Sequence, residues 1–305
     1  MPQQIAIVPS HSIDVAKLNA CVANNENGLI YASTLYFNTI TDNWHAIIIN
    51  DYTAVMPLPW RKKWGIKYLY TPPFIQQLGL IGNVDEATAQ AIILLITQQF
   101  QYGNVLMNFN NSFIATQKSV LEKSNFIIDL NNSYEAIKNN YHTSVNYSIS
   151  KAEKAGCTYV SADTVDEAIM PYKEFNSNNL LHVNETVYQK LTIIFEKFQQ
   201  QNKVLIRKVT NNKNELLSIV LLLKDDKRYY NIINYTSPKG RITDANYFLY
   251  NNVLKELANQ QMLFDFEGSD LPGVKKFYEK FGAVNQPYFH WHFNQLPFPF
   301  NLLKR

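Results

Sequence analysis

Apolar residues along this chain recur either at helical spacing or as the short apolar runs that are typical of strands. These patterns predict helices and strands in the N-terminal part of the chain. A helix is predicted over residues 12–22. A stronger helix is predicted over 85–100, because acidic residues open it and apolar residues recur at helical spacing. Asn50-Asp51 forms a turn between two apolar runs and predicts a hairpin. The predicted strands of this part cover residues 5–8, 44–50, 53–59, 65–70 and 105–109.

The second part of the chain repeats this order of elements. Three consecutive strands followed by a helix and another strand imply a mixed sheet that is covered by helices. We therefore predict an α/β fold (α+β, mixed sheet) in two domains, residues 1–124 and 125–305. The predicted strands cover residues 126–130, 204–209, 215–223, 228–235, 262–266 and 288–293. The predicted helices cover residues 133–139, 145–155, 165–179, 185–201, 244–259 and 271–281.

Composition narrows the classes of protein to consider. Apolar residues make up 46% and charged residues 17% of the 305 positions, which is typical of globular proteins. The net charge is only +3, whereas a protein that binds duplex DNA needs a dense basic face. The longest basic cluster, Arg61-Lys62-Lys63, lies between Trp60 and Trp64. Two readings stay open: contact with an anionic ligand or an RNA end, and a hairpin tip whose long side chains cover apolar surface.

Neither a metal nor a membrane span is expected. Cys21 and Cys157 are the only cysteines, too few for a thiolate zinc site, and no third ligand accompanies His290 and His292. No window reaches 18 consecutive apolar residues, and the N-terminus lacks the pattern of a signal peptide. We therefore expect a cytoplasmic protein.

The most informative segment runs from 264 to 283. It predicts a strand, a tight acidic loop and a helix with a proline in its first turn. Asp265 and Glu267 alternate with Phe264 and Phe266, so both carboxylates are expected on one strand face. At the C-terminal end of a strand, that face opens into the crevice where α/β sheets bind ligands. The alternative is a solvated sheet edge followed by an acidic helix start.

Three segments carry a resemblance to a known family. Residues 276–282, KFYEKFG, resemble the "fYeklGF" signature of GNAT acetyltransferases. Together with residues 72–79 and 149–156, they resemble FemAB-like proteins, which include the aminoacyltransferases that build peptidoglycan cross-bridges, also called methicillin-resistance proteins. The resemblance implies tandem GNAT-like (acyl-CoA N-acyltransferase) domains. It also implies that Tyr278 protonates the departing thiolate of coenzyme A. Cross-bridge enzymes often carry Lys at this position, so Tyr278 is more similar to relatives that use thioesters.

The resemblance suggests two binding regions. GNAT proteins place a phosphate-binding loop between a strand and a helix, where Lys239, Gly240 and Arg241 stand. An ordinary turn, capped by Thr243 or Asp244, is the alternative. For the acceptor, Lys151 and Lys154 share a helix face near Tyr147, on a helix that relatives use near the acceptor site. Gln76, in the segment 72–79, is a further candidate. A solvated helix face is the alternative for the two lysines.

These observations favour an N-acyltransferase or aminoacyltransferase that moves an acyl group from a thioester or ester donor to an amine on a small molecule or peptide. Tyr278 would act as general acid, and Asp265 or Glu267 would relay the proton of the amine. Acyl-CoA is the expected donor. Two alternatives stay open: a non-catalytic GNAT-like binding module, and a peptidoglycan-precursor aminoacyltransferase that uses aminoacyl-tRNA. The first domain lacks an FY..FG-like segment, so we expect it to be structural or to bind the acceptor.

Overall fold

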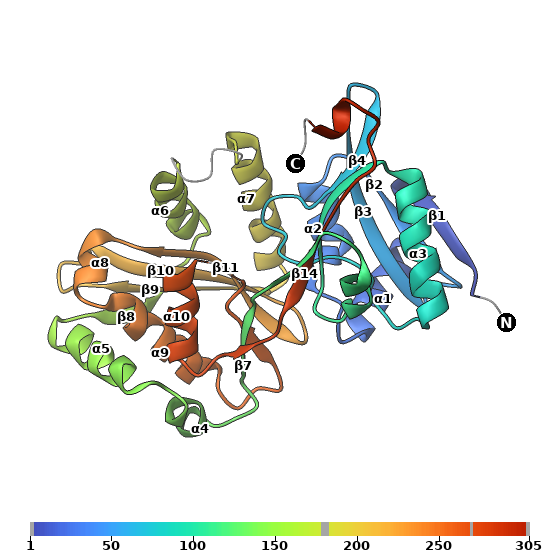
Figure 1. Cartoon of the computed structure of the whole chain (residues 1–305). Coiled ribbons are helices and arrows are strands. Elements are labelled where there is room, and N and C mark those ends of the chain that lie inside the picture. The colour runs from blue at the N-terminus through green and yellow to red at the C-terminus, as the bar shows by residue number, and fades with distance from the viewer. Residues whose placement is uncertain (1–2, 178–182, 269–270, 303–305) are drawn as a thin grey trace. The chain divides into compact units, whose positions relative to one another are not determined.

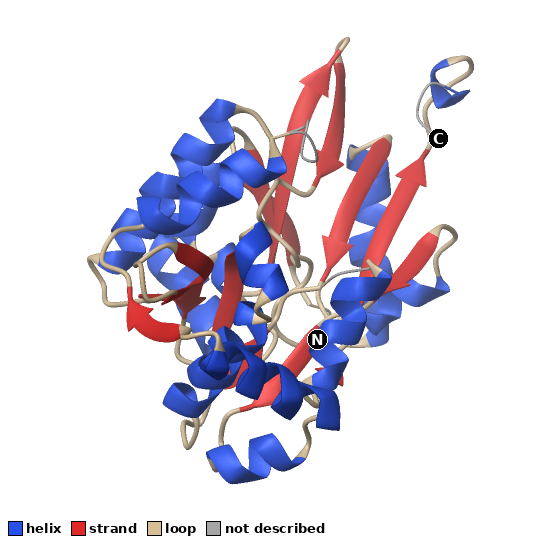
Figure 2. Cartoon of the chain, turned by 90° about the vertical axis from the view of Figure 1, so that its left-hand side faces the viewer, coloured by secondary structure: helices blue, strands red, loops and turns tan. Residues whose placement is uncertain are grey.

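The chain forms two compact units in the computed structural model, which describes residues 3–177, 183–268 and 271–302 (Figure 1). The first unit comprises Met1–Lys123 with Pro287–Arg305, and the second comprises Ser124–Gln286. The helix predicted over 165–179 is present as α6 (Asp166–Asn176); positions 178 and 179 lie outside the described residues. Each unit packs helices against its own sheet (Figure 2).

The first unit is built on a mixed sheet. The strands β4 and β5 are parallel and are joined by α3 (Glu86–Gln99), whereas the other neighbours are antiparallel. Asp85 caps α3, because its carboxylate accepts a hydrogen bond of 2.8 Å from the Thr88 N–H. Ile92 and Ile96 of this helix are buried in the core. The sheet order is β1 (Ile5–Pro9), β2 (Trp44–Ile49), β3 (Ala54–Lys63), β4 (Ile66–Tyr70), β5 (Tyr102–Met107), β14 (Tyr288–Asn294) and β6 (Val120–Lys123).

The second unit repeats this arrangement, as its sequence predicts. Three antiparallel strands, β9 to β11, lead through α9 (Ala245–Leu257) into β12, which is parallel to β11. The predicted mixed sheets are therefore confirmed in both units. The sheet order is β13 (Val284–Asn285), β7 (Phe126–Asp129), β12 (Leu263–Asp265), β11 (Arg228–Thr236), β10 (Leu216–Lys224), β9 (Val204–Thr210) and β8 (Thr158–Ser161).

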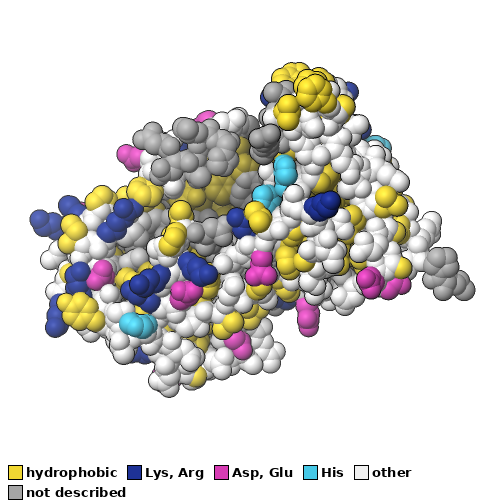
Figure 3. Space-filling model, viewed as in Figure 1, with side chains coloured by type: hydrophobic (Ala, Val, Ile, Leu, Met, Phe, Trp, Pro, Cys, Tyr) yellow, Lys and Arg dark blue, Asp and Glu magenta, His cyan; other side chains and the backbone are white. Residues whose placement is uncertain are grey.

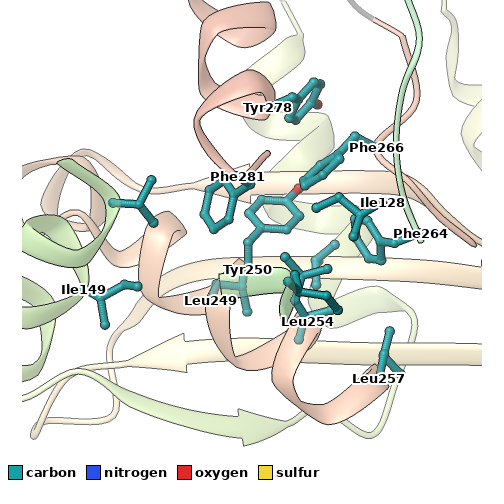
Figure 4. Close-up of a cluster of buried hydrophobic side chains, with 14 of the residues drawn as sticks. Ile128, Ile149, Leu249, Tyr250, Leu254, Leu257, Phe264, Phe266, Tyr278 and Phe281 are labelled. Atoms are coloured by element: carbon teal, nitrogen blue, oxygen red, sulfur yellow. The ribbon is translucent and has the colours of Figure 1, made fainter. Parts of the chain in front are cut away.

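Aromatic side chains fill the core of the second unit between the sheet and its helices (Figure 4). Tyr250 of α9 packs against Phe264, Phe266 and Phe281 with ring centroids 5.3–6.2 Å apart. None of the helices in the described ranges combines the length and apolar character that crossing a membrane requires. The remaining helices are α1 (Val15–Asn24), α2 (Thr34–Ile40), α4 (Tyr134–Asn139), α5 (Thr143–Lys154), α7 (Glu185–Gln199), α8 (Pro238–Ile242) and α10 (Pro272–Lys280), with 3-10 turns at Ser10–Ser12, Ile30–Ala32, Ser112–Thr116 and Phe300–Leu302.

The last strand differs from the sequence-based division of the chain. The second domain was expected to extend from 125 to 305, but β14 pairs with β5 and β6 and so belongs to the first unit. Gly103 of β5 permits this pairing, because a Cβ there would lie 2.2 Å from the ring of Phe293. The local pattern indicates a strand at this position. It does not indicate the partner, which lies 184 residues away in sequence for the pair His290 and Leu106.

Replacing Gly103 with Ala is expected to destabilise the protein by about 1–3 kcal/mol, because the added methyl group overlaps the Phe293 ring and forces β14 to shift. Gly273→Ala is the matched control. A Cβ at Gly273 meets nothing within 4 Å, and its position in the first turn of α10 favours Ala slightly. Chemical denaturation of both variants tests this expectation, and equal midpoints would contradict it.

Candidate functional site

The candidate site lies where β11 and β12 separate. The pairing of these parallel strands covers only Arg228–Leu263, Tyr229–Phe264 and Tyr230–Asp265. β11 then continues to Thr236, and a bulge opposite Leu221 and Leu222 bends it. Within the described residues, the backbone of β11 beyond Tyr230 therefore has no strand beside it on the β12 side. Such a gap at the C-terminal end of a parallel strand is where α/β sheets bind ligands.

Asp265 is buried below this gap in an ion pair. One carboxylate oxygen accepts a hydrogen bond of 2.9 Å from Arg228, and the two side chains are 1% and 3% exposed. Asn125 donates to the same oxygen at 3.3 Å. Burial raises the pKa of Asp265, while the guanidinium of Arg228 and the hydrogen bonds oppose that rise. This carboxylate is thus enclosed by protein groups and does not line an open crevice.

Glu267 does not share a strand face with Asp265, contrary to the sequence-based expectation. β12 ends at Asp265, and Glu267 takes a left-handed backbone conformation with φ of 62°. The second oxygen of Asp265 accepts a 2.9 Å hydrogen bond from the Glu267 N–H and so holds this turn. The alternation fails because Phe264, Asp265 and Phe266 are all buried, as expected where a parallel strand is covered on both faces. Ser269 and Asp270, which complete the acidic loop of the sequence, lie outside the described residues.

Tyr278 projects from α10 to the edge of the same region. Its ring stacks on that of Phe266, with centroids 4.5 Å apart, and the side chain lies at the rim of the aromatic cluster (Figure 4). Burial raises the pKa of the Tyr278 phenol, and the negative charges of Glu267 and Asp265 raise it further. The phenol therefore keeps its proton at neutral pH. That is the state a general acid requires.

Two asparagines that sequence reasoning missed lie on β11 beyond its pairing with β12. Asn231 and Asn234 donate hydrogen bonds of 2.8 Å and 2.5 Å to the hydroxyl of Tyr250. Asn231 also donates to the Phe266 carbonyl at 3.3 Å, which bridges the separating strands. Its amide oxygen is buried and has no hydrogen-bond partner among the residues that the structure describes. A sequence signal existed: two asparagines three positions apart interrupt the apolar run of β11.

The turn that follows β11 is closed by protein groups. The Ser237 hydroxyl accepts a 3.1 Å hydrogen bond from the Gly240 N–H and so caps α8, whereas Asp244 stands at the N-cap position of α9 without a side-chain cap hydrogen bond. A Cβ at Gly240 would lie 2.0 Å from the Leu217 carbonyl oxygen. The glycine is therefore required by the close approach of α8 to β10, and its N–H is not presented to a phosphate.

The two cations of this turn lie on its surface. Lys239 forms a 2.8 Å ion pair with Glu215, and both side chains are exposed. Arg241 lies over the ring of Phe175 in α6, with its guanidinium carbon 4.7 Å from the ring centroid. α6 packs on β11, and Tyr172 of α6 contributes to the raised pKa of Tyr278. The turn and the gap are thus bordered by the same helix.

The expected acceptor residues are not brought together by one unit. Lys151 of α5 forms a 3.1 Å ion pair with Asp244, next to the α8 turn. Tyr147 and Lys154 of the same helix are exposed. Gln76 belongs to the first unit, where its amide oxygen accepts a 3.3 Å hydrogen bond from Gln77. In the part of the chain that the structure describes, no three His, Cys, Asp or Glu residues gather closely enough to hold a metal ion.

Comparisons with known proteins identify the fold. No protein family matches the sequence. No curated protein matches it either. The structure is similar to that of FemX, with a TM-score of 0.67 and 13% identity over 100% of both chains. It is similar to a conserved protein of unknown function from Bacteroides thetaiotaomicron, with a TM-score of 0.60 and 11% identity over 93% of this chain and 99% of that one. It also resembles L-PGS from Bacillus licheniformis, with a TM-score of 0.53 and 12% identity over 95% of each chain.

The identities are low, so these likenesses establish the fold. The predicted tandem GNAT-like domains of mixed α/β class are confirmed, and the resemblance to FemAB-like proteins holds at the level of the fold.

Proposed function

We propose that this protein transfers an acyl or aminoacyl group from a thioester or ester donor to an amine. The observation that carries the proposal is the position of the Tyr278 phenol, whose ring stacks on Phe266 just after the end of β12 and which interacts electrostatically with Glu267 and Asp265. The transferase-type fold that the chain shares with FemX supports it. The acceptor is an amine of a small molecule or a peptide.

The reaction requires a proton acceptor and a proton donor. The amine nitrogen attacks the carbonyl carbon of the donor and forms the new C–N bond. The half-buried carboxylate of Glu267 takes the proton that the amine loses. The bond to the leaving sulfur or oxygen then breaks, and Tyr278 gives its proton to that atom. Asp265 acts as a positioning residue, because it holds the Glu267 backbone and is itself paired with Arg228.

Charge on the carbonyl oxygen develops during the attack and needs hydrogen-bond donors. The backbone of β11 from Asn231 to Thr236 is the strand edge that β12 does not cover. Backbone N–H groups at such an edge stabilise an oxyanion without reorganisation. The Asn231 amide oxygen, which has no hydrogen-bond partner within the described part of the chain, gives this edge a further polar atom for the donor or the acceptor.

The remaining candidate residues are assigned to binding of the donor and of the acceptor. Lys239 and Arg241 are the cations available to a pyrophosphate of coenzyme A, through their side chains and without help from the Gly240 N–H. Lys151, Lys154 and Tyr147 offer polar contacts to the acceptor on the face of α5. Gln76 stays a prediction.

Calorimetric titration with acetyl-CoA and octanoyl-CoA tests the identity of the donor. For a free thioester donor, we expect binding that weakens about tenfold in Lys239→Ala and in Arg241→Ala, because each loses a charge-assisted contact. Lys197→Ala, which removes an exposed lysine from α7 of the same unit, is the matched control and should leave the affinity unchanged. A Gly240 variant is unsuitable, because its side chain would disturb the packing against Leu217.

If neither thioester binds, a free acyl-CoA donor is ruled out. That result would favour one of two alternatives. The protein would be an aminoacyltransferase that uses aminoacyl-tRNA on a peptidoglycan precursor, or a binding module without catalytic activity. Single-turnover transfer from aminoacyl-tRNA to a peptide amine separates these two.

A further inference from the structure

The hairpin between β3 and β4 ends in an exposed tryptophan. Trp64 occupies its turn with φ of 52° and a relative exposure of 71%. Trp64 and Ile66 line a pocket together with Leu296 and Phe300 from the C-terminal segment. The hairpin and the C-terminal segment therefore lie next to each other at one end of the first unit.

The C-terminal segment adds further apolar surface at this end. Phe298 is 78% exposed, Leu302 is 51% exposed and Phe300 is 40% exposed. Figure 3 shows a group of hydrophobic side chains over the 3-10 turn and the neighbouring hairpin. We call this surface the apolar tip; it consists of Trp64, Ile66, Leu296, Phe298, Phe300 and Leu302. A contiguous group of large apolar side chains on the surface indicates an interaction site.

Cations lie along the hairpin that carries Trp64 and Ile66, with Lys63 on the face of Ile66 and with Lys62 and Lys67 on the opposite face. The sequence from Trp60 to Tyr68 contains Arg61, Lys62, Lys63 and Lys67 and no acidic residue. Lys63 lies 4.7 Å from the centroid of the Trp64 ring, and Arg61 forms a long ion pair of 3.8 Å with Asp42. Residues 287–305 also contain no Asp or Glu. The surroundings of the tip are thus positively charged.

We propose that the apolar tip docks the protein onto the surface of an anionic lipid bilayer. Trp and Phe side chains suit the boundary between headgroups and acyl chains, and Ile66, Leu296 and Leu302 would enter the acyl region. Lys62, Lys63 and Lys67 would lie at the level of anionic headgroups, where each lysine adds to the attraction. An RNA end would bind by stacking its bases on aromatic side chains. Three of the six residues of the apolar tip are aliphatic, which favours lipid as the partner. This inference is independent of the proposed transfer reaction.

Co-sedimentation of the full chain with vesicles tests the proposal. We expect binding to phosphatidylcholine vesicles that contain roughly one third phosphatidylglycerol, and much weaker binding to phosphatidylcholine alone. Lys62→Gln with Lys63→Gln should weaken binding about 25-fold, since each lysine near such a surface contributes about fivefold. Trp64→Asn should weaken it about tenfold, and Asn tolerates the positive φ of this position.

Two matched controls separate insertion from general adsorption. Leu94→Gln removes an exposed leucine from α3 of the same unit and should leave binding unchanged. Trp64→Phe should bind like the unchanged protein but lose most of the blue shift of tryptophan emission on vesicles, because Trp44 and Trp291 are already buried and Trp60 is half-buried with Lys67 4.7 Å from its ring centroid. Equal binding of Trp64→Asn and the unchanged protein would overturn the proposal. Binding of a single-stranded RNA oligonucleotide without any vesicle binding would overturn it as well, and would assign the hairpin to nucleic acid.

Discussion

Replacing Asp265 with Ala is expected to lower the free energy of unfolding by about 3–5 kcal/mol, because it leaves the guanidinium of Arg228 buried without a counter-charge. The substitution also removes the acceptor of the Glu267 N–H and so loosens the turn that follows β12. Asp265→Asn keeps the shape and an acceptor for that N–H, so its loss should be smaller. Denaturant unfolding of the full chain, monitored by circular dichroism, measures both values.

The matched control for this prediction is an exposed ion pair. Lys17 and Asp51 approach to 2.6 Å in the first unit, with side chains that are 48% and 75% exposed. Asp51→Ala should leave the unfolding midpoint nearly unchanged, because water screens such a pair. If Asp265→Ala unfolds at the same denaturant concentration as Asp51→Ala, the buried pair does not have the structural role assigned to it here.

Replacing Tyr278 with Phe is expected to lower kcat by about 10²-fold or more with little change in KM, once calorimetric titration has identified the donor. The variant removes one hydroxyl and keeps the ring that stacks on Phe266, so the fold should be preserved. Tyr134→Phe, which removes a hydroxyl that donates to Asn251 in the same unit and has no part in the proposed reaction, is the matched control and should lower kcat much less. Full turnover in Tyr278→Phe would exclude the assigned role of general acid.

The pH profile gives this prediction a second readout. Burial and the neighbouring carboxylates raise the pKa of Tyr278, so its acid form persists at higher pH than that of an ordinary tyrosine. The rate of the unchanged protein should therefore show no loss between pH 7 and about pH 10 that is due to deprotonation of a phenol. A basic limb in that range that disappears in Tyr278→Phe would contradict the raised pKa.

The order of elements could be predicted from the chain because it depends on local periodicity. The helix over 85–100 and the strand over 228–235 are present as α3 and β11, with ends that differ by at most one residue. The pairing of residues 288–293 could not be predicted, since their strand joins β5 from a distant part of the sequence. Gly103 accommodates Phe293 in that pairing, and a glycine in a strand does not by itself name the side chain that will pack against it.

The candidate site divides in the same way. The sequence by itself determined that Tyr278 lies on a helix after an acidic strand end, because the spacing of residues 264–281 fixes a strand, a turn and a helix. Only the tertiary structure decided which groups those residues contact. Arg228 lies 37 positions from Asp265 and turns its carboxylate into a buried ion pair, while the Asp265 side chain holds Glu267 in a left-handed turn. The physical reason for this difference is that the periodicity of a sequence indicates only which side of a helix or strand is apolar. The burial of a charge and the partner that neutralises it depend on contacts between distant segments.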